Sequence, residues 1–308
     1  MNPLIEDISW RGLVKDHTDI NQLSDRLDKG PITLYCGYDP TAESLHLGNL
    51  QMVVMLRRFQ LAGHKVVPLS GGGTGLIGDP SGRTEERQLR DIQTISQWTE
   101  LIKKQLIRCL PSDDASSSPI FADNSDWISG LSAVSLLRDI GKHFTINYML
   151  AKDSVTSRLE GKDEGLSFTE FSYMILQAFD YLTLYQKFGC ELQIGGSDQW
   201  GNITAGISLI KKKTGFDVFG LTSPLILKSD GSKFGKSEGG AVWLDRSKTS
   251  PFAMYQYFLN IPDSDVINLV KRLTFLPQIK ILDLEQEILT NPEKRPAQRV
   301  LASEVIKF

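Results

Sequence analysis

The 308-residue sequence is 41% apolar and 23% charged, proportions typical of a globular protein with a sizeable buried core. Its net charge of −3 argues against a surface coated in basic residues, so an RNA partner would bind a local patch or a part outside this sequence. No apolar run approaches the ~20 residues that crossing a membrane requires, and the three cysteines lack CxxC spacing. We therefore expect a cytoplasmic protein with reduced thiols and no metal site.

The first third of the sequence predicts alternating strands and helices. An apolar run at 32–38 predicts a strand, a helical pattern covers 47–61, and 65–69 predicts a second strand that enters a glycine cluster. A strand, a helix and a strand in this order indicate a right-handed crossover and a parallel sheet. Ligands bind such sheets at the carboxyl ends of the strands, where segments 38–48 and 70–79 both fall.

The remaining sequence is richer in helical patterns. We expect helices at 91–110 and through 133–188, strands at 192–196 and 225–228, and a polar loop at 111–118. A lysine-rich loop follows, and from residue 250 onward helical periodicity is punctuated by three prolines. The pattern predicts an α/β fold with a helical insertion, followed by a small all-helical domain.

Two glycine motifs suggest other nucleotide-binding folds. Gly73, Gly75 and Gly78 satisfy G-x-G-x-x-G, which would indicate a dinucleotide-binding oxidoreductase. That motif needs a helix running through its last glycine, yet Asp79-Pro80 follows at once, and a residue before proline is disfavoured in the α region. The run GSKFGKS at 231–237 imitates a Walker P-loop but has one residue too few between its glycines.

A stronger constellation lies at 35–49, YCGYDPTAESLHLGN, where His46 and Gly48 start a predicted helix just after a strand. Helix N-termini attract phosphate through unpaired backbone N–H groups and the helix dipole. Gly48 would let a nucleotide approach the backbone closely, while the His46 ring and the Asn49 amide can donate hydrogen bonds. The alternative is that His46 merely caps the helix.

The lysine-rich loop contains KFGKS, in which Lys233 and Lys236 form a cationic pair suited to a triphosphate. Together with the His-x-Gly helix start, this loop resembles the HIGH and KMSKS signatures of the class I aminoacyl-tRNA synthetases. Three further blocks resemble bacterial tyrosyl-tRNA synthetases: GGGTGLIGDPSGRTEER at 71–87, FTEFSYMILQAFD at 168–180 and QIGGSDQWGNI at 193–203. The resemblance runs from residue 11 to 308. It departs at Asn49, which replaces the second signature histidine, and at Phe234, Gly235 and Ser237, which vary the lysine signature.

This resemblance implies a tyrosine–tRNA ligase. The tyrosine carboxylate would attack the α-phosphorus of ATP, delivered with Mg²⁺, and the tyrosyl group would then pass to tRNA(Tyr); no permanently bound cofactor is implied. Because no protein nucleophile is needed, positioning and cationic groups should supply the catalysis. The implied catalytic residues are Thr41, His46, Asn49, Arg83, Arg87, Lys233, Lys236 and Ser237. The implied tyrosine site is Tyr35, Asp79, Tyr173, Gln177, Asp180 and Gln193. The implied ATP contacts are Cys36, Gly37, Asp39, Gly48, Gly196, Asp198 and Gln199.

Within these sets the resemblance places the phenolic hydroxyl at Tyr35 and Asp180 and the substrate ammonium at Asp79 and Gln177. Arg83 and Arg87 would lie near phosphate, although they are equally compatible with a solvated surface beside Glu85 and Glu86. A site built to bind a hydroxyl should reject phenylalanine without editing, and no segment is long enough for an editing domain.

The resemblance also implies an organisation and partners. A Rossmann-like catalytic domain would span 1–228, with a helical dimerisation insert at about 115–190, a KFGKS loop at 229–247 and an α-helical domain at 248–308. We expect a homodimer through 131–158, with helical core packing as the alternative for that segment. The family's RNA-binding domain would follow residue 308, so tRNA should bind this chain weakly. Two rivals remain: a tryptophanyl-tRNA synthetase, and a non-catalytic RNA-binding relative.

Overall fold

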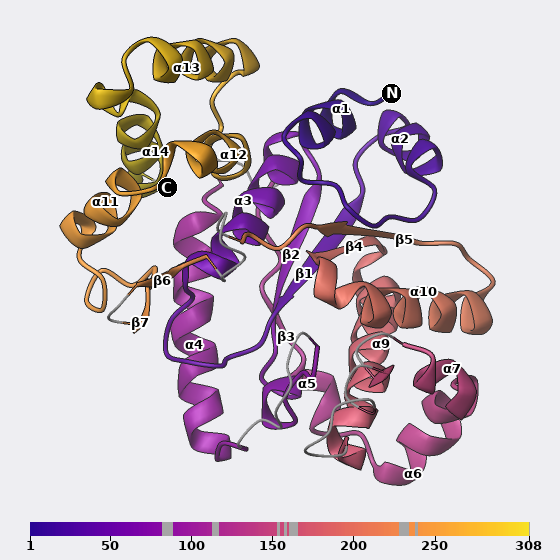
Figure 1. Cartoon of the computed structure of the whole chain (residues 1–308). Helices are drawn as coiled ribbons and strands as arrows, with labels where there is room; N and C mark the ends of the chain where they lie inside the picture. Colours follow the sequence, from indigo (N-terminus) through magenta and orange to yellow (C-terminus); the bar gives the residue numbers. More distant parts are fainter. Residues whose placement is uncertain are drawn as a thin grey trace.

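The computed structural model describes residues 1–81, 89–112, 117–152, 155–156, 159, 166–227, 234–237 and 240–307. Five parallel strands form one sheet in the order β3-β2-β1-β4-β5 (Figure 1). They are β1 (Thr33–Tyr38), β2 (Lys65–Ser70), β3 (Ala122–Asp123), β4 (Cys190–Gly196) and β5 (Phe219–Ser223). This arrangement confirms the predicted α/β fold. The order reverses between β1 and β4, and the crevice at such a reversal is where open parallel sheets bind ligands.

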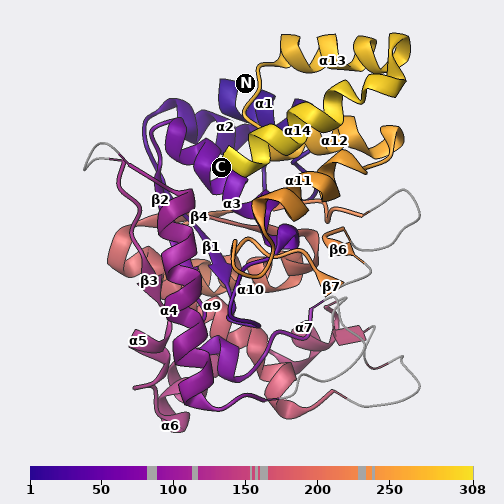
Figure 2. The ribbon, with the colours of Figure 1, turned by 90° about the vertical axis from the view of Figure 1, so that its left-hand side faces the viewer.

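Helices cover both faces of this sheet. α3 (Leu47–Leu61) and α4 (Ile92–Cys109) lie on one face, with α4 in front of the sheet in Figure 2, while α9 (Phe168–Phe188) and α10 (Trp200–Thr214) lie on the other. Successive residues of a strand point to opposite faces. Leu34 and Cys36 of β1 therefore join the core of α3 and α4, whereas Tyr35 joins the core of α9 and α10.

Short helices precede the sheet and connect β3 to α9. The chain opens with α1 (Pro3–Trp10), whose N-cap Asn2 accepts a hydrogen bond from the Leu4 amide at 3.0 Å, and α2 (Ile20–Asp28). The connection contains α5 (Ser125–Ile128), α6 (Ala133–Ser135), η2 (Leu136–Ile140), η3 (Gly141–His143) and α7 (Ile146–Leu150). The helical pattern predicted across 133–188 is therefore a series of short helices before the long α9.

The C-terminal helices form a second layer against α3. They are α11 (Pro251–Leu259), α12 (Asp263–Leu273), α13 (Gln278–Thr290), η5 (Pro292–Lys294) and α14 (Pro296–Lys307). We call α11 to α14 the helical region. Its buried residues share one core with α3 and with Phe234 and Val242, which flank the small hairpin of β6 (Lys236–Ser237) and β7 (Gly240–Ala241). The helices predicted after residue 250 are confirmed, while the domain boundaries at 228 and 247 stay predictions.

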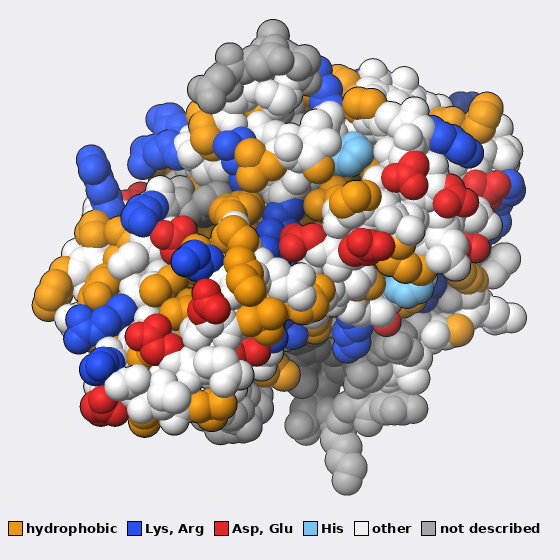
Figure 3. All heavy atoms as spheres, turned by 90° about the horizontal axis from the view of Figure 1, so that it is seen from above, with side chains coloured by type: hydrophobic (Ala, Val, Ile, Leu, Met, Phe, Trp, Pro, Cys, Tyr) orange, Lys and Arg blue, Asp and Glu red, His pale blue; other side chains and the backbone are white. Residues whose placement is uncertain are grey.

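One expected strand is wrong. The last strand of the sheet is Phe219–Ser223 rather than 225–228, because Pro224 interrupts the apolar run and the chain then leaves the sheet. None of the described helices is both long and apolar enough to cross a membrane. On the face seen from above, which includes α13 and α1, basic and acidic side chains are interspersed among the described residues (Figure 3).

Candidate active site

A cavity of about 470 Å³ lies at the carboxyl ends of β1, β2 and β4, beside the first turn of α3. It brings together most of the site residues that the sequence predicts: Tyr35, Cys36, Gly37, Asp39, Thr41, His46, Gly48, Asn49, Asp79, Tyr173, Gln177, Asp180, Gln193, Gly196, Asp198 and Gln199. Arg83, Arg87 and Lys233 lie outside the described residues. Lys236 and Ser237 are described only through their backbone, as β6.

The deep end of the cavity is organised around Asp180 of α9, whose side chain is buried. Trp127 Nε1 donates to Asp180 Oδ1 at 2.7 Å, and Asn124 Nδ2 donates to Asp180 Oδ2 at 2.9 Å. Burial raises the pKa of Asp180 to about 8, although the hydrogen bonds from Asn124 and Trp127 oppose the rise. The two donors hold the carboxyl group in a fixed orientation at the cavity wall.

Two further polar groups face the same end without a partner. Tyr35 Oη and Gln193 Oε1 are buried and have no hydrogen-bond partner among the described residues. Burial raises the pKa of Tyr35 well above its ordinary value, and the neighbouring Asp180 carboxylate adds to the rise, so its hydroxyl stays a donor. Buried polar groups are rarely left unpaired, so these atoms mark a place for a polar ligand.

A second network lines the middle of the cavity. Gln199 Nε2 donates to Asp79 Oδ2 at 2.6 Å, and Gln177 Nε2 donates to Gln199 Oε1 at 3.2 Å. Asn202 Nδ2 lies 3.0 Å from Gln177 Oε1, and the Ser81 amide donates to Asp79 Oδ1 at 2.9 Å. The Ser81 amide and Gln199 Nε2 thus fix the orientation of the Asp79 carboxyl group at the cavity wall.

Asp39 connects α9 to the glycine cluster that follows β2. Tyr173 Oη donates to Asp39 Oδ2 and Thr74 Oγ1 donates to Asp39 Oδ1, both at 2.7 Å. A Cβ atom on Gly71 would lie 2.0 Å from Asp39 Oδ1, so only glycine admits this carboxylate. The cluster leads into the three-residue turn η1 (Thr74–Leu76) and not into a helix, which removes the structural basis for the dinucleotide-binding alternative.

The outer end of the cavity is the first turn of α3. His46 is its N-cap, as the alternative interpretation of this residue held: the Gly48 amide donates to His46 Nδ1 at 3.0 Å, and the His46 amide donates to Asn49 Oδ1 at 3.1 Å. Because Nδ1 accepts, the proton of the neutral ring lies on Nε2. A Cβ on Gly48 would lie 2.8 Å from the ring of His46, so this glycine first makes room for the histidine.

The segment that follows the lysine signature packs against this turn. The Leu47 amide donates to the Val242 carbonyl at 2.9 Å, and the Leu244 amide donates to the Leu45 carbonyl at 2.8 Å. Gly235 has φ +84°, and a Cβ there would lie 3.0 Å from Leu47 Cβ. The described part of the signature therefore touches the helix start, although the two are far apart in the sequence.

Sequence reasoning missed several members of these networks. Asn124 and Trp127 follow β3, which has only two residues and gives no strand pattern to mark its carboxyl end. Thr74 and Ser81 lie in a block that carries the family resemblance as a whole, without a role for either residue. Asn202 lies inside the QIGGSDQWGNI block, and that block was the one available signal for it.

Comparisons with known proteins identify the family. The family model described as tRNA synthetases class I (W and Y) matches residues 27–308. The chain is 53% identical over 306 residues to a tyrosine–tRNA ligase 1 of Bacillus cereus and 54% identical over 306 residues to the tyrosine–tRNA ligase of Geobacillus kaustophilus. Each alignment covers 99% of this chain and 72% of the relative.

Solved structures agree with these sequence matches. A C-terminally truncated mitochondrial tyrosyl-tRNA synthetase of Aspergillus nidulans matches with a TM-score of 0.87 and 31% identity, covering 99% of this chain and 89% of that chain. A tryptophanyl-tRNA synthetase from Encephalitozoon cuniculi bound to tryptophan has a TM-score of 0.73 and only 13% identity, covering 99% and 87%, which is a likeness of fold alone. The chain therefore belongs to the class I tyrosyl-tRNA synthetases.

Proposed function

We propose that this chain activates L-tyrosine with ATP to form tyrosyl-adenylate and pyrophosphate, and then transfers the tyrosyl group to the 3′ end of tRNA(Tyr). The observation that carries the proposal is the deep end of the cavity. There Tyr35, Gln193 and Asp180 present buried polar atoms, two of them unpaired, to one enclosed space. A phenolic hydroxyl is the ligand group that satisfies such atoms.

In the proposed complex the phenol donates to Asp180 and accepts from Tyr35 Oη. Trp127 and Asn124 already donate to Asp180, so the carboxyl group is oriented before the substrate arrives. Phenylalanine would enter without a hydroxyl and leave these buried groups unpaired, which is the unfavourable outcome that gives strong discrimination. The same contacts distinguish tyrosine from tryptophan, whose indole cannot accept from Tyr35.

The substrate ammonium would lie in the middle of the cavity. Asp79 supplies a negative charge there, and the side-chain carbonyl of Gln177 supplies an acceptor. Both are held by the Gln199 and Asn202 network, so they are positioned before the substrate binds. The hydroxyl of Tyr173, which is anchored on Asp39, lies along the same wall.

ATP would bind across the outer end of the cavity with its phosphates at the start of α3. His46 Nε2–H and the Thr41 hydroxyl are donors on one side, and Lys233, Lys236 and Ser237 would supply the opposite side. Asp198 would contact the ribose together with the backbone at Cys36, Gly37 and Gly196. The remaining proposed nucleotide contacts are Asp39, Gly48, Asn49, Arg83, Arg87 and Gln199.

Magnesium would enter as part of the substrate, MgATP. The described residues contain no group of three or more His, Cys, Asp or Glu side chains that could hold a metal ion. Mg²⁺ commonly binds through substrate phosphates with few protein ligands. The protein's own part is to hold the tyrosine carboxylate and the α-phosphorus in line and to stabilise the leaving pyrophosphate.

We also propose a homodimer through 131–158, although only some of the apolar side chains of this segment are exposed. Ile140 and Phe144 are buried in the core beside α9, so the core-packing alternative describes these two residues. Val134, Leu137 and Ile146 are 69%, 62% and 60% exposed, which leaves apolar side chains on this surface for a second copy. Sedimentation showing only a monomer at micromolar concentration would contradict the dimer.

Pyrophosphate exchange tests the proposed function directly. Exchange of labelled pyrophosphate into ATP should depend on tyrosine, should be undetectable with tryptophan or phenylalanine at equal concentration, and should stop when EDTA removes Mg²⁺. Exchange supported equally by phenylalanine would refute the roles of Tyr35 and Asp180. Exchange supported only by tryptophan would refute the choice of substrate.

A further inference from the structure

One face of α3 packs against the helical region along the whole length of the helix. Leu47, Leu50 and Val54 belong to the core that α3 shares with α11, α12 and α14. Their spacings of three and four residues place them in one stripe, and the next position of that stripe is Arg58. The stripe thus begins beside the candidate phosphate site and ends in a buried positive charge.

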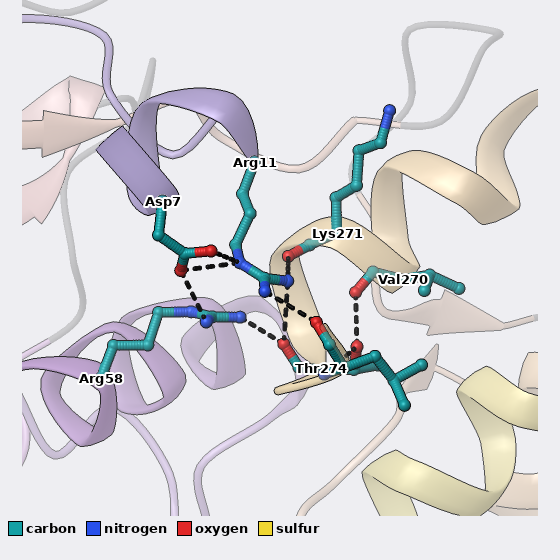
Figure 4. A network of polar contacts seen from close by, with 7 residues as sticks. Asp7, Arg11, Arg58, Val270, Lys271 and Thr274 are labelled. Carbon is teal, nitrogen blue, oxygen red and sulfur yellow. Dashed lines mark hydrogen bonds and ion pairs between the residues drawn. The ribbon is translucent and has the colours of Figure 1, made fainter. Parts of the chain in front are cut away.

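Arg58 meets the end of α12 inside a small polar cluster (Figure 4). Its Nη2 donates to the Thr274 carbonyl, and its Nη1 lies 3.2 Å from Asp7 Oδ2. Arg11 Nε donates to both oxygens of Asp7 at 2.9 and 2.8 Å, while its Nη1 and Nη2 reach the carbonyls of Lys271 at 3.1 Å and Leu276 at 2.8 Å. We call Asp7, Arg11 and Arg58 the arginine cluster.

The chemistry of this cluster suits the position it occupies. The last carbonyls of a helix lack intrahelical partners and carry the negative end of the helix dipole, so guanidinium groups satisfy both. Arg11 and Arg58 are 4% and 6% exposed, and Asp7 offsets part of their mutual repulsion. Burial, and then the neighbouring Arg11, lower the pKa of Arg58 to about 10, which leaves it charged at neutral pH.

At the opposite end of the stripe, the same helical region supports the outer end of the cavity. Phe234 and Val242 are buried in its core, and the Gly235 amide donates to Tyr257 Oη of α11 at 3.1 Å. Val242 in turn accepts from the amide of Leu47 at 2.9 Å. Where the helical region sits on α3 therefore sets where Gly235 and Val242 sit against His46 and Gly48.

We propose that Arg58, through Asp7 and Arg11, is a positioning residue for tyrosine activation: it fixes the helical region on α3 and so holds Gly235 and Val242 against the helix start. The predicted effect on the rate rests on the proposed function, tyrosyl-adenylate formation. Loss of the Arg58 contact leaves the core of Leu47, Leu50 and Val54 and the Arg11 hydrogen bonds as the remaining support, so the helical region can shift at its far end. Reactions that depend on positioning are sensitive to shifts of about 1 Å.

The same geometry predicts which steps stay unchanged. The proposed tyrosine contacts come from β1, β4 and α9 and from the turn at Asp79, and none of them contacts the arginine cluster. Equilibrium binding of tyrosine should therefore be preserved while the ATP-dependent step slows. A merely structural role would lower both together.

The kinetic test uses Arg58→Met, which keeps an unbranched chain about as long as the aliphatic stem of arginine and removes the guanidinium group. Single-turnover formation of tyrosyl-adenylate should slow by about tenfold or more with tyrosine affinity within about twofold of the wild type. Arg58→Lys should recover part of the rate, because one ammonium can reach Asp7 or the Thr274 carbonyl but not both in the guanidinium geometry. Asp7→Asn, the milder change, should give a smaller loss of the same kind.

Arg26 supplies the matched control. Its guanidinium makes a bidentate pair with Glu191 at 2.7 and 2.6 Å, linking α2 to β4 far from the helical region. Arg26→Met removes the same guanidinium chemistry from a shorter, bidentate ion pair, so it should lower thermal stability without a selective loss in the ATP-dependent step. An equal kinetic loss in Arg26→Met and Arg58→Met would overturn the proposal, as would a wild-type rate in a folded Arg58→Met.

Hydrogen exchange separates this inference from the proposed function, because it needs no substrate. In Arg58→Met the amides of Leu47 and Leu244, which bridge the segment and the helix start, and that of Val242, which donates to the Gly235 carbonyl, should exchange several-fold faster than in the wild type. The amides of β1 and β4 should not change. Unchanged exchange at all three would overturn the positioning role. Faster exchange in a protein without tyrosine-dependent activity would instead refute only the proposed function.

Discussion

The deep end and the outer end of the cavity are built differently. The deep end takes Tyr35, Gln193 and Asp180 from two neighbouring strands and the helix packed on them, and all three are nearly inaccessible to solvent. The outer end is assembled from the first turn of α3 and from segment 234–242, which belongs with the helical region. Discrimination needs polar groups that water cannot satisfy, so it suits a rigid interior. Stabilising a leaving pyrophosphate needs charges that gather around it, so it suits an assembly of separate parts.

The largest expected effect comes from variants of the two signature lysines, which should lower the rate of adenylate formation and leave tyrosine affinity unchanged. We expect Lys233→Ala and Lys236→Ala each to slow adenylate formation by on the order of 10²-fold or more, because these charges would act only on the developing pyrophosphate. Tyrosine affinity, set at the deep end, should stay nearly constant. Single-turnover kinetics and equilibrium dialysis of tyrosine measure the two quantities, and a variant with weak tyrosine binding but a normal chemical rate would place the loop elsewhere.

Asp180→Asn should do the reverse and weaken the discrimination between tyrosine and phenylalanine at the deep end. Asparagine offers one acceptor oxygen where Asp180 offers two, and a buried polar group left unpaired costs roughly 1–3 kcal/mol, so kcat/KM for tyrosine should fall by about 10- to 100-fold while that for phenylalanine changes little. The measurement is pyrophosphate exchange with both amino acids over a range of concentrations. Unchanged discrimination in this variant would show that the phenol lies elsewhere in the cavity.

Asp180 also predicts a pH dependence of stability at the deep end. Its pKa is about 8 in the folded protein against an ordinary value near 4 when unfolded, so between these values the folded state holds a proton that the unfolded chain has lost. The free energy of unfolding should therefore fall as pH rises through this window, by at most about 1.4 kcal/mol per unit. Urea titrations at pH 5.5 and 7.5 without ligands should show a shallower fall in Asp180→Asn, and parallel profiles would contradict the assignment.

The smallest expected effect concerns a single hydroxyl. Tyr35→Phe removes the unpaired Oη, and we expect kcat/KM for tyrosine to fall by about threefold to tenfold, since a neutral hydrogen bond contributes about 1 kcal/mol. Tyr181→Phe is the matched control, because Tyr181 is equally buried but donates to the Phe219 carbonyl outside the cavity. That variant should lose stability without losing discrimination. Equal kinetic losses in the two variants would mean that Tyr35 acts through packing.

Sequence patterns predicted the elements whose burial is regular. The periodicity at 47–61 predicted α3, and the apolar run at 32–38 predicted β1 to within a residue, because extensive burial gives each element apolar residues along its length. Patterns could not predict contacts made across the fold. Asn124 reaches Asp180 from another element, and Arg58 reads as an ordinary polar residue of an amphipathic helix until its contact with Thr274 is seen. The resemblance supplied the site residues, since spacing alone left His46 as a helix cap.

The glycine cluster after β2 limits how this pocket can be redesigned for other amino acids. A methyl group on Gly71 would lie 2.0 Å from Asp39 Oδ1, and one on Gly72 would lie 2.4 Å from Asp123 Oδ1, so each change would displace a carboxylate. Displacing Asp39 would also release the hydroxyl of Tyr173. A library that aims at bulkier substrates should therefore keep 71–75 constant and vary the side chains at the deep end, where a shorter residue makes space without moving the neighbouring networks.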